Sequence, residues 1–401
     1  MEAVKDLFVL ALLVYMFKKR IQIGHVFMVC AVLFGTFHTL SPLKLVSLFY
    51  TSLTSHSTLS IFLALYLITL LEKVMRKSGS QSKLVTGLVN LSGNPRITMA
   101  ALPAIIGLLP SPGGARFSAP LVEEASKGID LTGEQNAAIN YYYRHLWEFF
   151  LPLYPGTLVA AEILQVPLEK YVLVMLPFTV FAIIAGVLLF RNTPSKKLET
   201  PNKSDSSAWK DVVEGLSPIV AIMLLVLVFK LNIVYALFIT VACMFLYYRI
   251  SLNNIFPMIV SALEIRLLYM IFSAMYLREV LVQSGSTEQM LTYFQSIGLS
   301  TLLITIIFPL MMGLLTGFTL AGVTITLPIV ASLAGPDNLM ALGSLAFASI
   351  IIGIILSPMH LCLLMSIEHF SADFGKTYVK LLVPEALLLL FALAYYYILP
   401  F

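Results

Sequence analysis

The stretch Pro103-Ala104-Ile105-Ile106-Gly107-Leu108-Leu109 recurs later in the chain as Pro309-Leu310-Met311-Met312-Gly313-Leu314-Leu315, at an offset of 206 residues. At the same offset, Ser78-Gly79-Ser80 recurs as Ser284-Gly285-Ser286. Between residues 78 and 115 this offset gives nine identities in 38 positions, more than a leucine-rich composition produces by chance. We therefore expect two halves built on one plan.

The composition is typical of a membrane protein. Apolar residues make up 59% of the 401 residues, charged residues only 11%, and the mean hydropathy is +0.92. Because apolar runs long enough to cross a bilayer recur along the chain, we expect an all-α polytopic membrane protein. Cys30, Cys243 and Cys362 lie in apolar stretches without paired spacing, so they support neither a disulfide framework nor a metal-thiolate site.

Each half contains five expected crossings. They are residues 6–17, 21–40, 45–71, 135–165 and 168–190, and then 212–229, 233–248, 254–282, 339–370 and 380–399. Since five is odd, the second half begins on the opposite face, which predicts inverted repeats over residues 1–190 and 212–401. Lys and Arg gather on one side when the crossings are threaded alternately, and that side is the cytoplasm. We expect a cytoplasmic linker at 191–211, with both termini outside the cell membrane.

Two further apolar stretches are interrupted and too short to cross twice. Residues 97–125 are interrupted by Pro110-Ser111-Pro112-Gly113-Gly114, and residues 303–333 by Thr316-Gly317-Phe318-Thr319. We expect a re-entrant helical hairpin in each half. Irregular backbone at membrane depth survives only where it is buried in protein or lines a wet cavity, so each turn is a candidate site wall.

The crossing that follows each hairpin is expected to be a broken helix. Residues 135–165 are interrupted at Pro155-Gly156, and residues 339–370 at Ser357-Pro358-Met359-His360. Proline frees a carbonyl of the preceding turn, which suits a Na+ ion. The positive N-terminus of the half-helix that follows suits an anion.

Each candidate substrate-binding residue lies at a hairpin tip or at a helix break. Glycines there allow close approach to the backbone, hydroxyl groups supply oxygens, and Arg116 supplies a two-pronged donor for a carboxylate or phosphate. Arg116 can instead pair with Glu123 or Glu124. The set is Ser111, Gly113, Gly114, Arg116, Thr157, Thr316, Gly317, Thr319 and His360.

The candidate coupling-ion residues are Ser111, Glu148, Pro155, Gly156, Thr316 and Ser357. Oxygen cages without a carboxylate favour Na+, whereas H+ needs a titratable group, for which Glu148, His145 and His360 are the candidates. The helix breaks occur in both halves, while Glu148 and His360 are matched by Ile351 and Thr157, and this favours Na+.

Several polar residues have a structural alternative. Arg144 and Glu148, four residues apart, can form a self-neutralising pair on one helix face, and His360 can be a packing residue. Glu264 and Arg266 lie opposite the polar run 54–58 of the first half. We expect a continuous helix at residues 54–58 and at residues 264–266. We therefore interpret these polar residues as a contact between helices or subunits rather than a transport site.

Other functional classes lack their motifs. The sequence contains no H-E-x-x-H, no G-x-S-x-G, no nucleotide-binding glycine loop and no Cys/His cluster in sequence, so ATP-driven transport and enzymatic catalysis are unsupported. A basic nucleic-acid surface is absent too. We expect no cofactor or metal apart from Na+ as a coupling ion.

At the paired hairpins and broken helices the chain resembles the ion-transporter superfamily, which includes arsenite, citrate, gluconate and sodium-coupled dicarboxylate carriers. The segments Pro110–Phe117 and Ser357–Cys362 look like those of a prokaryotic integral membrane family of unknown function. The resemblance implies a dimerisation scaffold and a transport body, with substrate between the hairpin tips. The Ser-Asn-Thr tips of dicarboxylate carriers are missing here, which argues against a dicarboxylate.

The leading hypothesis is a secondary active transporter of a small anionic solute, coupled to Na+ or H+ and working by elevator-type alternating access. The expected partners are the solute, the lipid bilayer and a second copy in a homodimer. One alternative is a cation/proton antiporter of the same architecture, in which Glu148 would dominate. The other is a membrane-embedded enzyme or lipid-handling protein that uses the pocket at His360.

Overall fold

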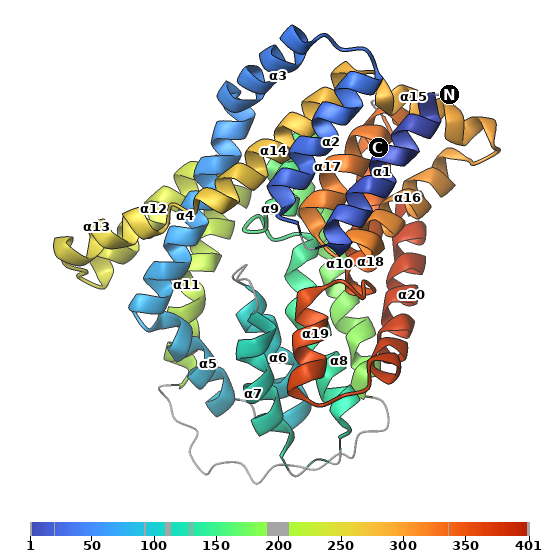
Figure 1. The fold of residues 1–401 in the computed structure, drawn as a ribbon. Helices are drawn as coiled ribbons and strands as arrows, with labels where there is room; N and C mark the ends of the chain where they lie inside the picture. The colour runs from blue at the N-terminus through green and yellow to red at the C-terminus, as the bar shows by residue number, and fades with distance from the viewer. Residues whose placement is uncertain are drawn as a thin grey trace.

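The computed structural model describes residues 2–19, 21–91, 94–108, 114–127, 129, 131–190, 208–335 and 337–398. All regular structure in these ranges is helical, as the composition predicts (Figure 1). The tip of the first hairpin, with Ser111 and Gly113, lies outside the described residues. So does most of the expected linker, and residues 208–211 of that linker begin a helix.

The helices of the first half are α1 (Glu2–Lys18), α2 (Ile23–Phe37), α3 (Pro42–Thr54), α4 (His56–Lys77), α5 (Ser80–Leu91), α6 (Pro95–Gly107), α7 (Gly114–Ser126), α8 (Gly133–Arg144), η1 (Leu146–Phe149), α9 (Pro155–Ile163), α10 (Leu168–Gly186) and η2 (Val187–Phe190). Those of the second half are α11 (Ala208–Leu227), α12 (Ile233–Tyr247), α13 (Leu252–Ser261), α14 (Ile265–Gln283), α15 (Ser286–Ser296), α16 (Thr301–Thr316), α17 (Thr319–Leu333), α18 (Leu339–Ile355), α19 (Leu361–His369) and α20 (Phe374–Ile398).

The second half follows the helix order of the first. α5 begins at Ser80 and α15 at Ser286, and α9 begins at Pro155 and α19 at Leu361, both at the offset of the sequence repeat. Packing partners match as well, since α4 packs on α12 and α14 on α2, while α7 packs on α19 and α17 on α9. The two halves therefore interleave. In Figure 1 the pair α6–α7 lies low and the pair α16–α17 lies high, and the inverted relation of the halves stays a prediction.

The glycine of the repeated motif marks a close helix contact in both halves. A Cβ at Gly107 of α6 would overlap the carbonyl group of Arg144 in α8, and a Cβ at Gly313 of α16 would overlap that of Ile350 in α18. Only glycine allows two backbones to approach this closely. The motif therefore holds the first helix of each hairpin against the broken helix that follows it.

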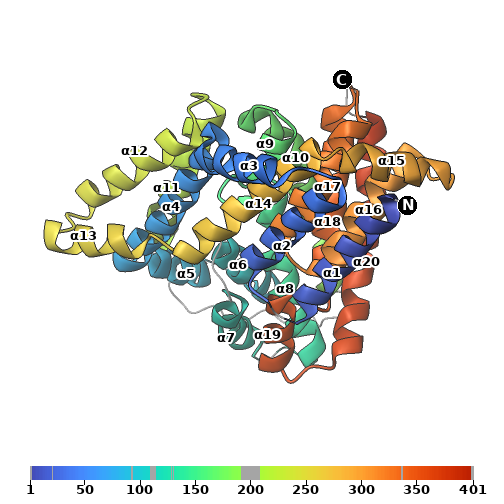
Figure 2. The same ribbon diagram turned by 45° about the horizontal axis from the view of Figure 1, so that its top comes forward.

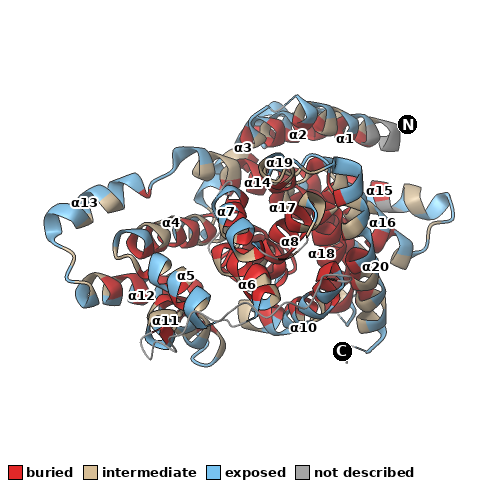
Figure 3. Ribbon diagram, turned by 90° about the horizontal axis from the view of Figure 1, so that it is seen from below, coloured by how far each residue is buried: buried red, intermediate tan, exposed pale blue. Residues whose placement is uncertain are grey.

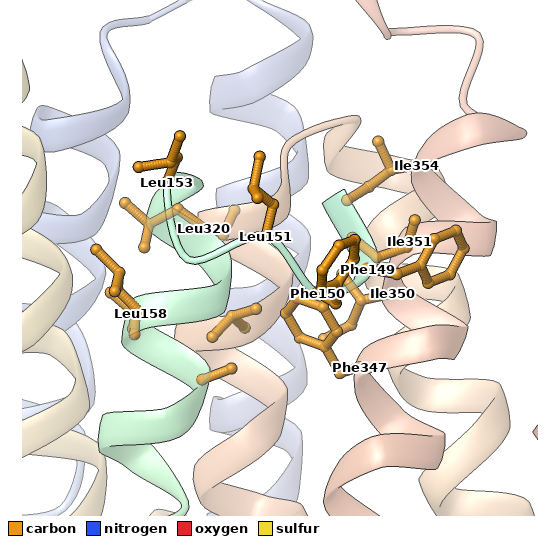
Figure 4. Packing of buried hydrophobic residues seen from close by; sticks show 14 of the residues in the cluster. Phe149, Phe150, Leu151, Leu153, Leu158, Leu320, Phe347, Ile350, Ile351 and Ile354 are labelled. Carbon is orange, nitrogen blue, oxygen red and sulfur yellow. The ribbon is translucent and has the colours of Figure 1, made fainter. Parts of the chain in front are cut away.

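Buried apolar side chains surround the broken helices. Leu151 and Leu153, between η1 and α9, are almost fully buried, and Phe347 and Ile351 of α18 are completely buried (Figure 4). Figure 3 shows the buried residues concentrated at the centre, around α8, α17 and α18, while α13 has no buried residue. α13 and α15 lie at opposite edges of the molecule (Figure 2).

Among the described helices, α4, the continuous α10–η2 segment (Leu168–Phe190) and α20 are individually long and apolar enough to cross a bilayer. The bent pairs α13–α14 and α15–α16 meet the same criteria when each pair is taken together. Several other apolar helices have only 10 to 17 residues. Much of the expected crossing pattern is therefore built from short helices that meet at breaks.

Two of these breaks contradict the expectation of continuous helices near residues 54–58 and 264–266. The segment 45–71 is divided at Ser55, whose side chain accepts a hydrogen bond from the Thr58 N–H at 3.2 Å and so caps α4. The segment 254–282 turns at residues 262–264, where α13 and α14 are bent by 42°. The helices α5 and α15, which precede the hairpins, were not expected either.

Candidate functional site

The first helix break carries the charged side chains. α8 ends at Arg144, η1 follows, and α9 starts with Pro155 at its first position, where a missing N–H costs no helical hydrogen bond. Because α8 ends at Arg144, Arg144 and Glu148 do not share one regular helix face. Glu148 is instead 9% exposed and accepts a hydrogen bond from the Thr319 hydroxyl at 3.0 Å.

The second break is held to the neighbouring hairpin by hydrogen bonds. The Ser357 hydroxyl donates to the Leu314 carbonyl of α16 at 2.6 Å and accepts from the Met359 N–H at 3.1 Å. His360 is the N-cap residue of α19, and its Nδ1 lies 2.9 Å from the Gly317 carbonyl oxygen. The broken helix and the hairpin tip therefore form one unit.

The described hairpin tip depends on a glycine. Gly317 ends α16 with φ = 61°, in the left-handed region that favours glycine. A Cβ there would lie 2.9 Å from the Ser357 Oγ, which leaves no room for a side chain. Thr316 uses its hydroxyl to donate to the Met312 carbonyl at 2.7 Å, so it stabilises the end of α16.

Two histidines from the two breaks face each other. His145 Nε2 and His360 Nε2 are 3.0 Å apart, and His145 Nε2 lies 3.8 Å from a carboxylate oxygen of Glu148. The outer nitrogen of His145, Nδ1, is 2.6 Å from the Tyr141 carbonyl oxygen. Cys362 completes the cluster, because its sulfur and the nearest nitrogens of the two histidines all lie within 4.8 Å of one another.

A cavity of about 500 Å³ opens onto this cluster, between two groups of helices. One wall is formed by the two breaks and the tip of the α16–α17 hairpin. The opposite wall is formed by α4, α14 and the start of α2 and includes both acidic and basic side chains. The polar and turn residues that line the cavity are Gln22, Thr69, Glu72, Arg144, His145, Glu148, Tyr154, Pro155, Gly156, Glu264, Arg266, Gly317, Thr319, His360 and Cys362.

A larger hollow of about 810 Å³ lies elsewhere, between α6, α8, η1 and α10 with η2. Its walls are mostly apolar, with Asn94, Arg96, Tyr143 and Trp147 as the exceptions. None of the described candidate residues lines it. The smaller cavity is therefore the candidate functional site, because the ionisable side chains converge there.

Six of the candidate residues meet in this cavity: Glu148, Pro155, Gly156, Gly317, Thr319 and His360. Thr316, Ser357 and Thr157 are buried beside the same breaks. The Thr157 hydroxyl has no hydrogen-bond partner among the described residues. A Cβ at Gly156 would overlap the Thr319 side chain, so glycine allows the start of α9 to pack on the second hairpin.

Gly114 and Arg116 lie at the start of α7, outside the cavity lining. The space in front of Gly114 is taken by the Arg144 guanidinium, which a Cβ at position 114 would overlap. Arg116 is exposed, and among the described residues Glu123 is hydrogen-bonded to His369 and Glu124 to Lys127. Arg144 is therefore the arginine that the first half contributes to the cavity in this conformation.

Sequence reasoning missed part of the site. Cys362 was assigned to an apolar stretch, although it lies beside two histidines. Glu264 and Arg266 were interpreted as a contact between helices or subunits, yet both line the cavity at the break between α13 and α14. The available signal for Glu264 and Arg266 was a pair of opposite charges inside a long apolar segment, which is by default a functional hypothesis.

Comparison with solved structures shows a similar fold in a protein described as a transporter. The YdaH transporter of Alcanivorax borkumensis, whose crystal structure is described as having an unusual topology, matches with a TM-score of 0.60 and 14% identity. The match covers 96% of this chain and 98% of that one. No curated protein matches the sequence. The family described as "Protein of unknown function (DUF401)" matches residues 2–398, so the chain belongs to that family.

Proposed function

We propose that the chain is a secondary active transporter of a small anionic solute, driven by a Na+ or H+ gradient through elevator-type alternating access. The observation that carries the proposal is the cavity of about 500 Å³, in which both helix breaks and a hairpin tip face a second group of helices. Broken helices that meet near the middle of a membrane protein are the usual place of a transported solute.

The preference for an anion rests on Arg144 and on the two short helices. The chain turns into α9 at Pro155 and into α19 at Leu361, and both residues line the cavity. The first N–H groups of a helix have no intrahelical partner and attract negative charge. Together with the Arg144 guanidinium they favour a carboxylate or phosphate group.

The coupling ion follows from the same breaks. Main-chain carbonyls of the irregular segments that precede Pro155 and Leu361 can coordinate Na+ without a carboxylate, whereas H+ coupling would use a titratable group of the cavity. The fold shared with a protein described as a transporter supports the general class. The cation/proton antiporter remains the second candidate, because Glu148 faces the cavity and is hydrogen-bonded only through one oxygen to Thr319 among the described residues.

The membrane arrangement belongs to the same proposal. We propose a homodimer in the cell membrane, with both termini outside and membership of the ion-transporter superfamily. α13 supports a dimer contact, because it has no buried residue, and Leu252 and Phe256 are 81% and 71% exposed. A Phe256→Cys variant should cross-link to its own copy in membranes, whereas Phe229→Cys, which is exposed on another helix end, should not. Equal cross-linking of the two variants would remove α13 as the contact.

The test begins with purified protein and a panel of small anions. A ligand that binds only the folded state raises the melting temperature, and replacing Na+ by K+ shows whether Na+ takes part. The ligand found is then offered to proteoliposomes under a Na+ gradient or a proton gradient. Uptake driven by Na+ is expected. Uptake that needs only the proton gradient and disappears in Glu148→Gln would assign H+ instead, and no uptake under either gradient would refute the transport proposal.

A further inference from the structure

The histidine pair has an unusual arrangement of hydrogen-bond donors. His145 Nδ1 faces the Tyr141 carbonyl oxygen at 2.6 Å, and His360 Nδ1 faces the Gly317 carbonyl oxygen at 2.9 Å. A carbonyl oxygen only accepts, so both Nδ1 atoms must carry the hydrogen. Each neutral ring then presents a bare lone pair at Nε2, and these two lone pairs meet at 3.0 Å.

Two facing lone pairs require a cation between them. A proton shared by the two rings would satisfy both lone pairs, but it would not involve the nearby sulfur of Cys362. Cys362 converges on the same point, and its sulfur and the two histidine nitrogens lie within 4.8 Å of one another. Two imidazoles and a thiolate are a ligand set for Zn2+ and related transition-metal ions.

The surroundings of the cluster also resemble those of a metal site. Histidine ligands usually donate their second ring N–H to a carbonyl or carboxylate, which fixes the tautomer and the ring orientation, and both histidines do so here. Zn–N distances of about 2.0–2.1 Å need a nitrogen separation only a little larger than the one observed. One carboxylate oxygen of Glu148 lies 3.8 Å from His145 Nε2, close enough to provide a fourth ligand after a small movement.

Both negatively and positively charged side chains lie near the cluster. The Cys362 thiolate and Glu148 would offset the two charges of a divalent ion, whereas the Arg144 guanidinium, which lines the same cavity, adds a positive charge. The two negative charges and the convergence of three ligands oppose this repulsion. The cavity beside His360 and Cys362 supplies the path by which an ion enters.

We propose that His145 Nε2, His360 Nε2 and Cys362 Sγ form a binding site for a divalent transition-metal ion of the Zn2+ type, with the remaining coordination position open to Glu148 or to a cavity ligand. This ion would connect the break between α8 and η1 with the break before α19. It departs from the expectation that the chain binds no metal apart from Na+. The site does not depend on the proposed transport activity, and its test uses binding alone.

The test uses the purified full-length chain, freed of metal with a chelator and then titrated with Zn2+ or Co2+. One equivalent is expected to bind, and Co2+ should give a thiolate-to-metal charge-transfer band. X-ray absorption at the zinc edge of the unaltered protein should show one sulfur at about 2.3 Å and two nitrogens at about 2.0–2.1 Å. Because this measurement needs no substitution, it does not depend on how well a variant folds.

Matched variants identify the ligands. Cys362→Ser should abolish the charge-transfer band, and His360→Gln should weaken Zn2+ binding by more than about 100-fold, beyond the effect usual for outer residues. Cys243→Ser and His369→Gln, which change an exposed cysteine and a partly exposed histidine elsewhere, should bind like the unaltered chain. Absence of stoichiometric binding, zinc coordinated without sulfur, or unchanged binding in folded Cys362→Ser would overturn the proposal and leave the histidines as a pair that shares a proton.

Discussion

Tyr154 and His360 occupy equivalent positions in the two halves, but their side chains make different contacts. Each is the N-cap residue of a nine-residue helix, α9 or α19, and each side chain bonds to a carbonyl of the preceding hairpin. The Tyr154 hydroxyl donates to Gly107 at 2.5 Å, and His360 Nδ1 lies 2.9 Å from the Gly317 oxygen. Tyrosine has no second polar atom, whereas histidine has Nε2, which reaches His145. One shared framework therefore supports a structural contact in one half and a cluster of ionisable side chains in the other.

The charged residues at the breaks before α9 and α19 also differ between the halves, but they occur in the first half rather than the second. Arg144 and Glu148 belong to the first break, and the residue that matches Arg144 at the repeat offset is Ile350. The glycine contacts at Gly107 and Gly313 are the same in both halves. The repeat thus preserves backbone packing, while the site is assembled from side chains that the halves do not share. Substitutions at these positions test this distinction.

Arg144→Gln should weaken anion binding by roughly 10- to 100-fold, since a hydrogen bond to a charged group contributes about 1.5–3 kcal/mol. Binding to the anion identified by thermal shift is the quantity to measure. Arg116→Lys provides the comparison, because it keeps the charge but removes the two-pronged geometry. If Arg116→Lys loses affinity while Arg144→Gln does not, the anion binds at the first hairpin tip instead.

Gly107→Ala and Gly313→Ala should each lower the free energy of unfolding by about 1–3 kcal/mol, because the added methyl group meets a backbone carbonyl that cannot rotate away. Melting temperatures in detergent measure this loss. Gly335→Ala is the control, since its Cβ would meet nothing within 4 Å. Similar melting temperatures for all three variants would show that the repeated motif does not act through close helix packing.

Tyr154→Phe should cost about 0.5–1.5 kcal/mol, the usual contribution of one hydrogen bond. His360→Phe removes the equivalent bond and the contact with His145 as well, so its effect on stability should be larger. The two melting temperatures give the comparison directly. If Tyr154→Phe is the more destabilising change, the second contact of His360 contributes nothing to the fold.

The sequence predicts the breaks that proline and glycine mark. Breaks occur at Pro155 and at Ser357-Pro358 as expected, although the first break already begins after Arg144, and Gly317 ends α16. The breaks at Ser55 and at residues 262–264 were missed, because neither contains proline or glycine, and the polar residues there were interpreted as a contact between helices or subunits. A side-chain cap and a local backbone turn are enough to end a helix there.

The site was harder to predict, because its parts come together from both halves. His145 and Cys362 lie far apart in sequence, and no local spacing indicates that they approach each other. The matching of His360 with Thr157 and of Glu148 with Ile351 was wrong by three residues, since it aligned the prolines rather than the helix starts at Pro155 and Leu361. The exposed position of Arg116 depends on which face of α7 is covered, which the sequence alone does not determine.

If the protein works by alternating access, the cavity between the two helix groups opens to each side of the membrane in turn. With Cys30→Ser and Cys243→Ser, Cys362 becomes the only thiol and lines that cavity. Proteoliposomes are treated with a small membrane-impermeant thiol reagent added outside or enclosed inside. Ser204→Cys and Asn338→Cys, each with Cys362→Ser, are the fixed controls.

We expect Cys362 to react from both sides, in proportions that change with the ion gradient. Ser204→Cys and Asn338→Cys should each react from one side only, and from opposite faces. Reaction of Cys362 from a single side under every gradient would contradict alternating access, and labelling of both controls from the same face would contradict the inverted repeat.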